Sequence, residues 1–559
     1  MQKLELTWIG KEKQLHVEPR ILLHDPSKDY GDPDSQNMLI HGDNLLALKA
    51  LEQQYAGKVK CIYIDPPFNT GARIDADGKE IGYDDGVEHS IWLQLMAERL
   101  KILHKLLSDD GALFIHLDDN EVDYCRVLTD EIFGRRNFMN RITVDARSPS
   151  AFSTVNPGVF KAAEYILFYA KNRSKLVENQ LRTERTPDYA YDKYVVNIED
   201  NYKNWSFTTV SEAYERTAPR TSKLQTALNN YNKFIVKNAH RIFRLTSISD
   251  SGAGQAVVAL KYTSKEHPTE IFRMERKNLD DVYVLNGQQI SFYNKNIAEV
   301  EGKTCASMIL TDIWKDIAWE GIAKEGGVKF KKGKKPERLL KRCLELVTNS
   351  GDLVLDSFLG SGTTAAVAHK MGRKYIGIEM GPQCYSLCAP RLERIINGTD
   401  KTGISKIVNW QGGGGYKFYE LAPTLIEKDK YGNPIFSKKY NPTMLAAAVA
   451  KINGFTYAPD AEVYWKQGYS QEKSYIYVTT QYLTTKQLDS IASDVSDFEQ
   501  LLICAPAFDN GLNKRYDNIN IRKIPQSVLD KCEFGVDNYN LNIVNPPVID
   551  EAEWEEEDE

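Results

Sequence analysis

The sequence contains no long apolar segment, and this absence excludes a membrane-spanning chain. No run approaches the ~18 uncharged apolar residues that a transmembrane helix needs, and the first stretch, MQKLELTWIGKEKQ, lacks the apolar centre of a secretory signal. The apolar fraction of 42% and the charged fraction of 26% are ordinary for a globular protein. We therefore expect a cytoplasmic protein with no membrane partner.

Cysteine is scarce and scattered, with eight residues in 559. The closest pair, Cys384 and Cys388, lies one helical turn apart with no second pair nearby, whereas zinc sites usually show tighter paired spacing. Free thiols in a reducing compartment explain this usage better than disulfides do. The sequence therefore predicts no metal site.

Two further features are missing: a phosphate loop and an overall positive charge. Because no G-x-x-x-x-G-K-[ST] sequence is present, we do not expect a translocase or an ATP-driven nuclease within this chain. The net charge is −6, but the charges are unevenly distributed along the chain. Residues 550–559 contain eight acidic residues in ten, and residues 329–342 contain eight basic residues in fourteen. The acidic end is expected to be a disordered tail, and the basic run is either a solvated face or a patch that binds phosphates.

Short apolar runs alternate with helical patterns in two blocks, 36–173 and 311–398. In the first, strands are predicted at 58–64, 112–117 and 164–170, with one helix from about 92 to 107 and a second helix, capped by Asp118–Glu121, that runs to about 133. In the second, a helix begins at Pro336, strands are predicted at 353–355 and 374–378, and a helix at 363–371. This alternation is typical of a doubly wound, mostly parallel α/β sheet.

The remaining segments do not show this alternation. Residues 174–310 are polar and rich in Asn, Ser, Thr, Lys and aromatic side chains, so we interpret them as a domain inserted between the two blocks. Residues 1–35 form an N-terminal arm, 399–549 a mixed C-terminal region, and 550–559 the acidic tail.

The first motif with chemical meaning is Asp65-Pro66-Pro67-Phe68, at the end of a predicted strand. Ligands of open α/β sheets bind beyond the carboxyl ends of the strands. The two prolines remove backbone donors, so that nearby carbonyls can accept from a ligand. Asp65 adds a carboxylate acceptor and Phe68 a flat apolar ring, a combination that suits a primary amine on an aromatic heterocycle. The alternative is a turn in which the aspartate caps a helix.

The second motif, Asp356-Ser357-Phe358-Leu359-Gly360-Ser361-Gly362-Thr363-Thr364, lies between a strand and a helix. Its glycines allow a close approach between backbone and ligand. Glu379, 23 residues beyond Asp356, ends the next strand, a spacing that suits a carboxylate receiving ribose hydroxyls. A nicotinamide enzyme could use this motif, but it has no need for an amine site. A methyltransferase needs both motifs.

With these residues the sequence resembles the DNA amino-methyltransferases of the permuted (beta-class) arrangement, in which the catalytic motif precedes the cofactor motif. Asp rather than Ser before the prolines favours adenine N6 over cytosine N4. Gly42-Asp43-Asn44, Lys335-Pro336 and Glu379 also match family elements around the cofactor. The stretches LIHGDNLLALKAL, IYIDPPFNTG, HLDDNE and GISKIVNWQGGGGYKFYEL extend the resemblance to the Mod subunits of type III restriction-modification systems.

The resemblance implies a seven-stranded, Rossmann-like sheet that binds S-adenosyl-L-methionine. The residues implied around this cofactor are Asp43, Pro336, Asp356, Phe358, Gly360, Gly362, Thr363 and Glu379, with Glu379 on the ribose and Asp43 on the adenine amine. For Asp43 a helix N-cap is the alternative, and for Lys335-Pro336 a plain helix start.

The partners implied by the same resemblance are double-stranded DNA, a second copy of the chain and an ATP-dependent restriction (Res) subunit. The insertion 174–310 corresponds by position to the target-recognition domain, and 399–549 would make dimer or partner contacts. The family places the protein in a bacterial or archaeal cytoplasm. A flexible insertion without a role in DNA binding remains the alternative for 174–310.

These residues suggest a specific reaction. We expect Asp65 and the carbonyl of Pro66 to accept the two N–H bonds of an adenine amine that has flipped out of the duplex, with Phe68 stacked on the base. Three alternatives stay open: a cytosine N4 methyltransferase, an enzyme that modifies a glutamine side chain or RNA, and a DNA-binding subunit without turnover. An orphan methyltransferase without a restriction partner also shares this core.

Overall fold

A computed structural model describes residues 5–12, 17–18, 20–69, 89–147, 159–218, 224–277, 279–319, 321–330, 333–428, 434–437, 439–471 and 473–524. The chain divides into two compact units: one contains residues 1–179 and 312–559, and the other contains 180–311. Within the described residues, no helix is both long and apolar enough to cross a membrane. The seven cysteines in this part are buried free thiols, whereas Cys532 and the tail 550–559 lie outside it.

The first unit is built on one large sheet with the strand order β1-β20-β3-β19-β18-β4-β5-β7-β6-β17. Neighbours from β20 to β5 run parallel, while β7 is antiparallel to both β5 and β6. The strands are β1 (Leu22–His24), β3 (Met38–His41), β4 (Val59–Ile64), β5 (Leu107–Leu117), β6 (Phe138–Asp145), β7 (Ala163–Ala170), β17 (Ile313–Trp314), β18 (Leu353–Asp356), β19 (Lys374–Glu379) and β20 (Gly415–Leu421). The predicted mostly parallel, doubly wound α/β class is confirmed.

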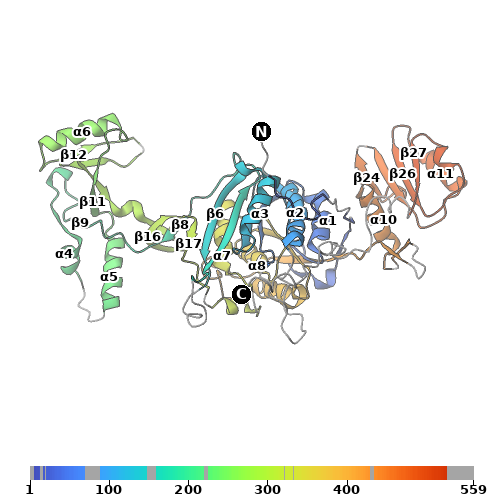
Figure 1. Ribbon diagram of the computed structural model, residues 1–559, viewed down its shortest axis with the longest axis horizontal. Helices are drawn as coiled ribbons and strands as arrows, with labels where there is room; N and C mark the ends of the chain where they lie inside the picture. The colour runs from blue at the N-terminus through green and yellow to red at the C-terminus, as the bar shows by residue number, and fades with distance from the viewer. Residues whose placement is uncertain are drawn as a thin grey trace, which may run out of the picture. The chain divides into compact units, whose positions relative to one another are not determined.

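Two groups of helices accompany this sheet, and the members of each group pack on one another (Figure 1). The first comprises α1 (Asn44–Tyr55), α2 (His89–Leu106) and α3 (Val122–Thr129), and the second comprises α7 (Glu337–Val347), α8 (Thr363–Lys370) and α9 (Ala389–Ile396). In α2 the apolar side chains spaced by three and four residues, such as Trp92, Met96 and Leu100, are fully buried in the main core. Burial of such an apolar stripe is what stabilises a helix on a sheet.

The structure differs from the sequence prediction at the start of one strand and in the extent of the sheet. The strand expected at 112–117 begins at Leu107, because its first residues already pair with β4 across a register shift. The helix expected after a cap at Asp118–Glu121 is confirmed as α3, which starts at Val122 and continues as a wider turn to Gly134. The sheet also extends beyond 36–398, since β20 joins it next to β3 and β1 pairs with β20.

Residues 334 and 335 of the basic run do not match either sequence interpretation. Lys334 and Lys335 are 4% and 5% exposed, so they form neither a solvated face nor a surface patch. The ammonium of Lys334 is held by the carbonyl oxygens of Glu325 and Val328.

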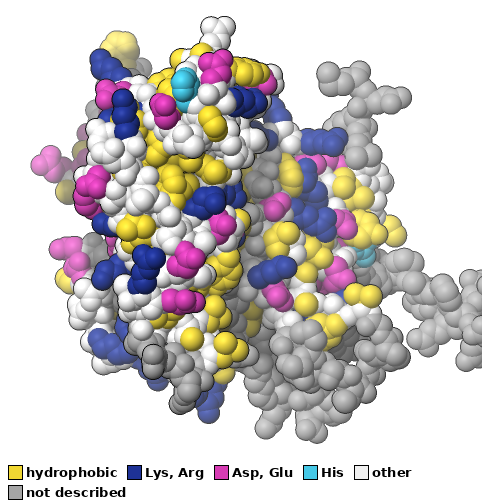
Figure 2. Space-filling view, turned by 90° about the vertical axis from the view of Figure 1, so that its left-hand side faces the viewer, with side chains coloured by type: hydrophobic (Ala, Val, Ile, Leu, Met, Phe, Trp, Pro, Cys, Tyr) yellow, Lys and Arg dark blue, Asp and Glu magenta, His cyan; other side chains and the backbone are white. Residues whose placement is uncertain are grey.

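The second unit has its own small cores. Its six-stranded antiparallel sheet has the order β10-β9-β11-β14-β13-β12, and a three-stranded sheet pairs β15, β16 and β8. The elements are β8 (Arg182–Glu184), β9 (Lys193–Val195), β10 (Phe207–Thr209), α4 (Val210–Glu215), α5 (Leu224–Lys237), β11 (Ile242–Ser247), α6 (Gln255–Glu266), β12 (Ile271–Met274), β13 (Val282–Leu285), β14 (Gln288–Phe292), β15 (Ile297–Val300) and β16 (Lys303–Ile309). Residues 180–311 contain 18 Lys and Arg against 15 Asp and Glu, a net charge of +3 in a chain of net charge −6. In the space-filling view, basic side chains are interspersed with acidic and apolar ones (Figure 2).

The region after β20 contains a second, smaller α/β sheet, with the order β23-β24-β25-β26-β27. Its elements are β23 (Thr456–Tyr457), β24 (Gly468–Gln471), β25 (Ser474–Val478), β26 (Gln500–Ala505) and β27 (Ile519–Lys523), with α10 (Pro442–Ile452) and α11 (Thr485–Asp494). A short hairpin of β21 (Ile426–Lys428) and β22 (Pro434–Phe436) precedes them.

Candidate active site

The two sequence motifs meet at the carboxyl ends of neighbouring strands. Leu355 of β18 pairs with Ile62 of β4, so Asp356 and Asp65 emerge at the same edge of the sheet. The chain continues from β4 to β5 on one side and from β18 to β19 on the other. The boundary between β4 and β18 is therefore a topological switch point, the position where open α/β sheets bind their ligands.

The segment Asp65–Phe68 is anchored to α2 by its backbone. The indole N–H of Trp92 donates to the carbonyl oxygen of Pro67 at 2.7 Å, which shows why a fully buried tryptophan occupies this position of the helix. Phe68 is half-buried and packs against the main core, with its ring centroid 6.1 Å from that of His116. The next residue, Asn69, has a left-handed backbone (φ 57°) and donates to Glu121, which ties the end of the motif to the N-cap residue of α3.

Asp65 faces a buried ammonium. Lys335 Nζ lies 3.1 Å from Asp65 Oδ1 and 3.4 Å from Glu164 Oε2, and the Asp65 side chain keeps 20% of its surface exposed. Burial raises the pKa of Asp65 above its ordinary value, and the charge of Lys335 opposes this rise. Sequence reasoning named Lys335 only as an element near the cofactor and missed Glu164, whose one signal is a carboxylate inside the apolar strand EYILFYA.

The glycine-rich turn is organised by two carboxylates. Asp356 accepts from Thr364 Oγ1 at 2.5 Å and from the backbone N–H of Phe358 at 2.8 Å. Burial raises the pKa of Asp356 to about 7. Glu379, 1% exposed, accepts from the backbone N–H groups of Gly360 at 2.7 Å and Gly381 at 2.8 Å. The predicted acid at the end of β19 therefore lies directly against the predicted turn.

Gly360 and Gly362 both have left-handed backbones, with φ of 57° and 79°. A Cβ added to Gly362 would lie 3.3 Å from Cα of Cys388, so this glycine allows α9 and its preceding turn to pack closely on the loop. At Gly360 the nearest atom to an added Cβ is the Phe358 carbonyl oxygen at 3.9 Å, which leaves open space over the turn. Thr363 begins α8, and its hydroxyl accepts from Arg391 Nη1 at 2.8 Å.

The turn has the features that a nucleoside cofactor requires. Open space lies over Gly360, and the buried hydroxyl of Ser357 has no hydrogen-bond partner among the described residues. Two carboxylates, Asp356 and Glu379, supply acceptors for hydroxyl and ammonium groups at the same edge. Each carboxylate oxygen can accept more than one hydrogen bond, so Glu379 can hold the glycines and still receive a ribose hydroxyl.

Two predicted cofactor residues have clear structural roles. Asp43 is the N-cap of α1, accepting from Leu46 N at 3.0 Å, and lies 3.6 Å from a nitrogen of Arg99. Its neighbour Asn44 donates to the Ser357 carbonyl at 2.7 Å, which ties this cap to the glycine-rich turn. Pro336 is the buried N-cap position of α7 and directly follows Lys335.

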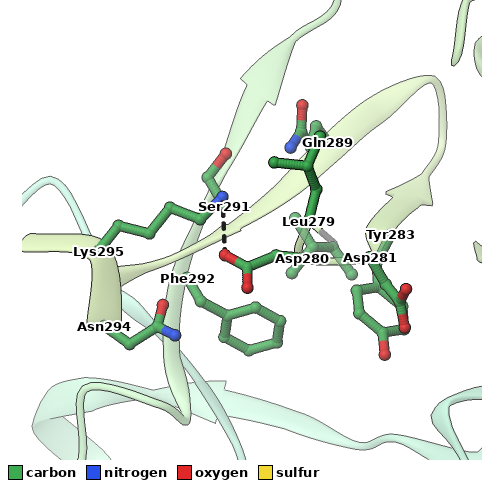
Figure 3. A pocket seen from close by; sticks show the side chains of 10 residues that line it. Leu279, Asp280, Asp281, Tyr283, Gln289, Ser291, Phe292, Asn294 and Lys295 are labelled. Atoms are coloured by element: carbon green, nitrogen blue, oxygen red, sulfur yellow. Dashed lines mark ion pairs between the residues drawn. The ribbon is translucent and has the colours of Figure 1, made fainter. Parts of the chain in front are cut away.

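The inserted unit contains a separate surface depression, lined by β13, β14 and the residues around them (Figure 3). Its charged pair, Lys295 Nζ and Asp280 Oδ2 at 3.3 Å, has side chains that are 55% and 66% exposed. Ion pairs so open to solvent are weak, and the depression contains none of the predicted site residues.

The chain is similar to known DNA methylases. A family model described as "DNA methylase" matches residues 59–389, more than half of the chain. The "Probable type III restriction-modification enzyme HindVI Mod subunit" of Haemophilus influenzae is 37% identical over 70% of this chain and 54% of its own length. The type III restriction-modification enzyme EcoPI Mod subunit of Escherichia phage P1 is 27% identical over 71% of this chain and 65% of its own length. The chain thus spans less than two thirds of each.

Among solved structures, the PvuII DNA methyltransferase (cytosine-N4-specific) aligns with 71% of this chain and 95% of its own, at 14% identity and a TM-score of 0.30. The matched span of the family model runs from the first residue of β4, just ahead of Asp65, to the first residue of α9, beyond Glu379. It therefore encloses both motifs and the insertion between them. The chain belongs to the DNA methylase family.

Proposed function

We propose that this chain transfers a methyl group from S-adenosyl-L-methionine to N6 of adenine in double-stranded DNA, as the modification and specificity subunit of a type III restriction-modification system. The observation that carries the proposal is the meeting of Asp65 and the Gly360–Gly362 turn at the ends of paired strands. A methyl acceptor and a methyl donor bound at these two places would lie side by side.

The cofactor would be held by the glycine-rich turn and the carboxylates around it. Asp356 and Glu379 supply acceptors, Phe358 an apolar surface, and Gly360 and Gly362 a backbone without side chains. Thr363 helps fix the turn through Arg391, and Asp43 and Pro336 fix the two helix starts next to it. When bound, S-adenosyl-L-methionine supplies a methyl group on a positively charged sulfur that leaves as a neutral thioether.

The chain's own task is to position a poor nucleophile. The lone pair of an adenine amine is delocalised into the ring, and Asp65 together with the Pro66 carbonyl would accept its two N–H bonds and direct the nitrogen at the methyl carbon. Such positioning and fixed dipoles supply most of the rate enhancement. As the new N–C bond forms, one of the two amine protons leaves, and the carboxylate of Asp65 is placed to accept it.

The base must leave the duplex to reach this buried edge. Flipping costs a few kcal/mol, and stacking on the Phe68 ring would return about 1–3 kcal/mol. The separate unit of residues 180–311, with a net charge of +3, would contact phosphates and base edges. The relatives are named as subunits of restriction-modification enzymes, which supports a partner subunit. The ATP-dependent Res partner and a second copy of this chain are proposed from the family resemblance, with 399–549 as the region for such contacts.

Mapping of modified bases tests the proposal. Genomic DNA from a host expressing the wild-type protein should carry N6-methyladenine at one short sequence, and DNA from a host expressing Asp65→Ala should not. Because Asp65 lies outside the glycine-rich turn, the purified variant should still bind S-adenosyl-L-methionine in calorimetry. N4-methylcytosine would instead identify a cytosine N4 enzyme, and cofactor binding without any methylated base would identify a non-catalytic specificity subunit.

A further inference from the structure

Asp65 is the outermost member of a connected group of buried polar side chains. Lys335 Nζ lies 3.1 Å from Asp65 Oδ1, 3.4 Å from Glu164 Oε2 and 4.5 Å from the centroid of the Phe68 ring. His116 Nε2 lies 2.9 Å from the same Glu164 oxygen. The hydroxyl of Tyr63 lies 2.7 Å from His116 Nδ1. One ammonium therefore connects the predicted amine clamp to a carboxylate in β7.

These side chains come from three strands and the segment before α7, so separate parts of the fold hold each of them. Tyr63 lies on β4, His116 on β5, Glu164 on β7 and Lys335 immediately before α7. His116 is 0% exposed, Lys335 5% and Glu164 6%. Because a buried ammonium without partners is strongly unfavourable, the two carboxylates are what makes the position of Lys335 possible.

The ammonium affects Asp65 in two ways. It contacts Oδ1, which is a buried atom, so the exposed part of the Asp65 side chain belongs to its other atoms. This contact leaves Oδ2 as the carboxylate oxygen to receive a ligand. It also favours the ionised carboxylate. The pKa of Lys335 itself is raised because Asp65 and Glu164 outweigh the effect of burial, so the lysine stays charged at neutral pH.

We propose that Lys335 is a positioning residue for the amine clamp, and that Glu164 anchors it. Lys335 keeps Asp65 ionised, occupies Oδ1 and lies against the Phe68 ring, so that Oδ2 and the ring are presented to the substrate in a fixed arrangement. This inference rests on the proposed methyl transfer at Asp65. It differs from the role around the cofactor that the sequence suggested for Lys335-Pro336.

The two neighbours of Asp65 have opposite effects on its ionisation, and this opposition gives a sharp test. Lys335 lowers the pKa of Asp65, whereas Glu164 raises it. The titratable or charged groups around Asp65 are Lys335, Glu164, His116, Tyr63 and Asp356, with Arg147 placed 3.7 Å from Glu164. Removing one charge at a time therefore shifts the pKa of Asp65 in a predictable direction.

The experiment measures kcat against pH for the full-length protein at saturating S-adenosyl-L-methionine and DNA. In Lys335→Met, the acid limb of the profile should move to higher pH by at least one unit. At pH values below this limb, kcat should be at least tenfold lower than in the wild type. In Glu164→Gln, the limb should move down, and in Lys335→Arg it should stay near the wild-type position. Lys341→Met is the matched control, because Lys341 is also largely buried on α7 but pairs with Glu345; its limb should not move.

A purely structural lysine would lower kcat equally at every pH and leave the limb in place, and that result would overturn the proposal. A second readout does not need methyl transfer. The carboxylate infrared band of Asp65, assigned by difference from Asp65→Asn, should titrate at higher pH in Lys335→Met and at lower pH in Glu164→Gln. Unchanged midpoints refute the inference, whereas shifted midpoints in a protein that methylates no DNA support it and refute the proposed function alone.

Discussion

Leu355 of β18 is the register partner of Ile62 of β4, although the two residues lie in opposite halves of the methyltransferase core. This pairing places Asp356 and Asp65 at one edge of the sheet, close enough for the charge of Asp65 to raise the pKa of Asp356. Because parallel strands present their carboxyl ends together, the order of the two motifs along the chain does not matter to the site.

Replacement of Phe68 by Ala tests whether the ring holds the substrate base. If the base stacks on this ring, the substitution removes about 1–3 kcal/mol of transition-state binding, a loss of about 5- to 150-fold in kcat/KM. The affinity for duplex DNA should change little, since phosphates and base edges elsewhere supply most of it. Methyl transfer kinetics and a DNA-binding titration measure the two effects, and Phe68→Tyr, which keeps a ring, is the control. Wild-type turnover in Phe68→Ala would show that the ring only packs against the core.

Gly362→Ala tests the packing of the cofactor turn. Alanine in a left-handed conformation costs about 1–2 kcal/mol, and its Cβ would lie 3.3 Å from Cα of Cys388, displacing the turn. We therefore expect both a lower unfolding temperature and weaker binding of S-adenosyl-L-methionine. Gly57→Ala is the matched control. Gly57 also has positive φ, of 69°, but has open space around it and precedes β4 at the other end of the strand, so that variant should lose stability and retain cofactor affinity. Equal cofactor affinities in the two variants would contradict the prediction.

The positions of both motifs were predictable because each depends on local sequence. An apolar strand followed by Asp-Pro-Pro-Phe, and one followed by Asp and a glycine turn, specify where the backbone must turn. The burial of Lys335 was not predictable, since it lies in a run of bases that looks solvated, and its partners Asp65 and Glu164 come from distant strands. Likewise, β20 joins the sheet beyond residue 398 through pairing with β3, a long-range contact that no local pattern encodes.

The raised pKa of Asp356 predicts that the affinity for S-adenosyl-L-methionine depends on pH. Its pKa is raised to about 7, first by burial and also by the nearby charges of Asp65 and Glu379. Below pH 7 the free protein therefore holds this group mostly as a neutral acid, and a cationic ligand that needs the carboxylate must displace the proton. The affinity for S-adenosyl-L-methionine should fall by about tenfold from pH 8 to pH 6, as measured by calorimetry. Asp356→Asn should bind weakly with no such pH dependence; a wild-type affinity independent of pH would show that Asp356 does not face the cation.

The contacts of Glu337 predict that substitution of this residue lowers both the stability of the protein and its affinity for the cofactor. This carboxylate is 0% exposed, accepts from Lys370 at 2.7 Å and from Arg391 at 2.8 Å, and also binds the backbone of Ile404. Arg391 in turn donates to the Ser361 carbonyl and the Thr363 hydroxyl, the two residues on either side of Gly362. Loss of one partner from a buried ion pair leaves an uncompensated charge, which costs about 3–5 kcal/mol.

Glu337→Gln should therefore unfold at markedly lower denaturant concentration and bind S-adenosyl-L-methionine more weakly, because Arg391 is no longer held against the turn. Glu98→Gln is the matched control: its partner Lys101 lies on the same helix, 2.8 Å away with a side chain that is 54% exposed, and exposed pairs contribute about 0–1 kcal/mol. Denaturant unfolding measures the stability of both variants, and calorimetry measures their affinity for S-adenosyl-L-methionine. If Glu337→Gln were as stable as Glu98→Gln, the buried cluster would not hold the cofactor turn, and Thr363 would have to be positioned by α8 alone.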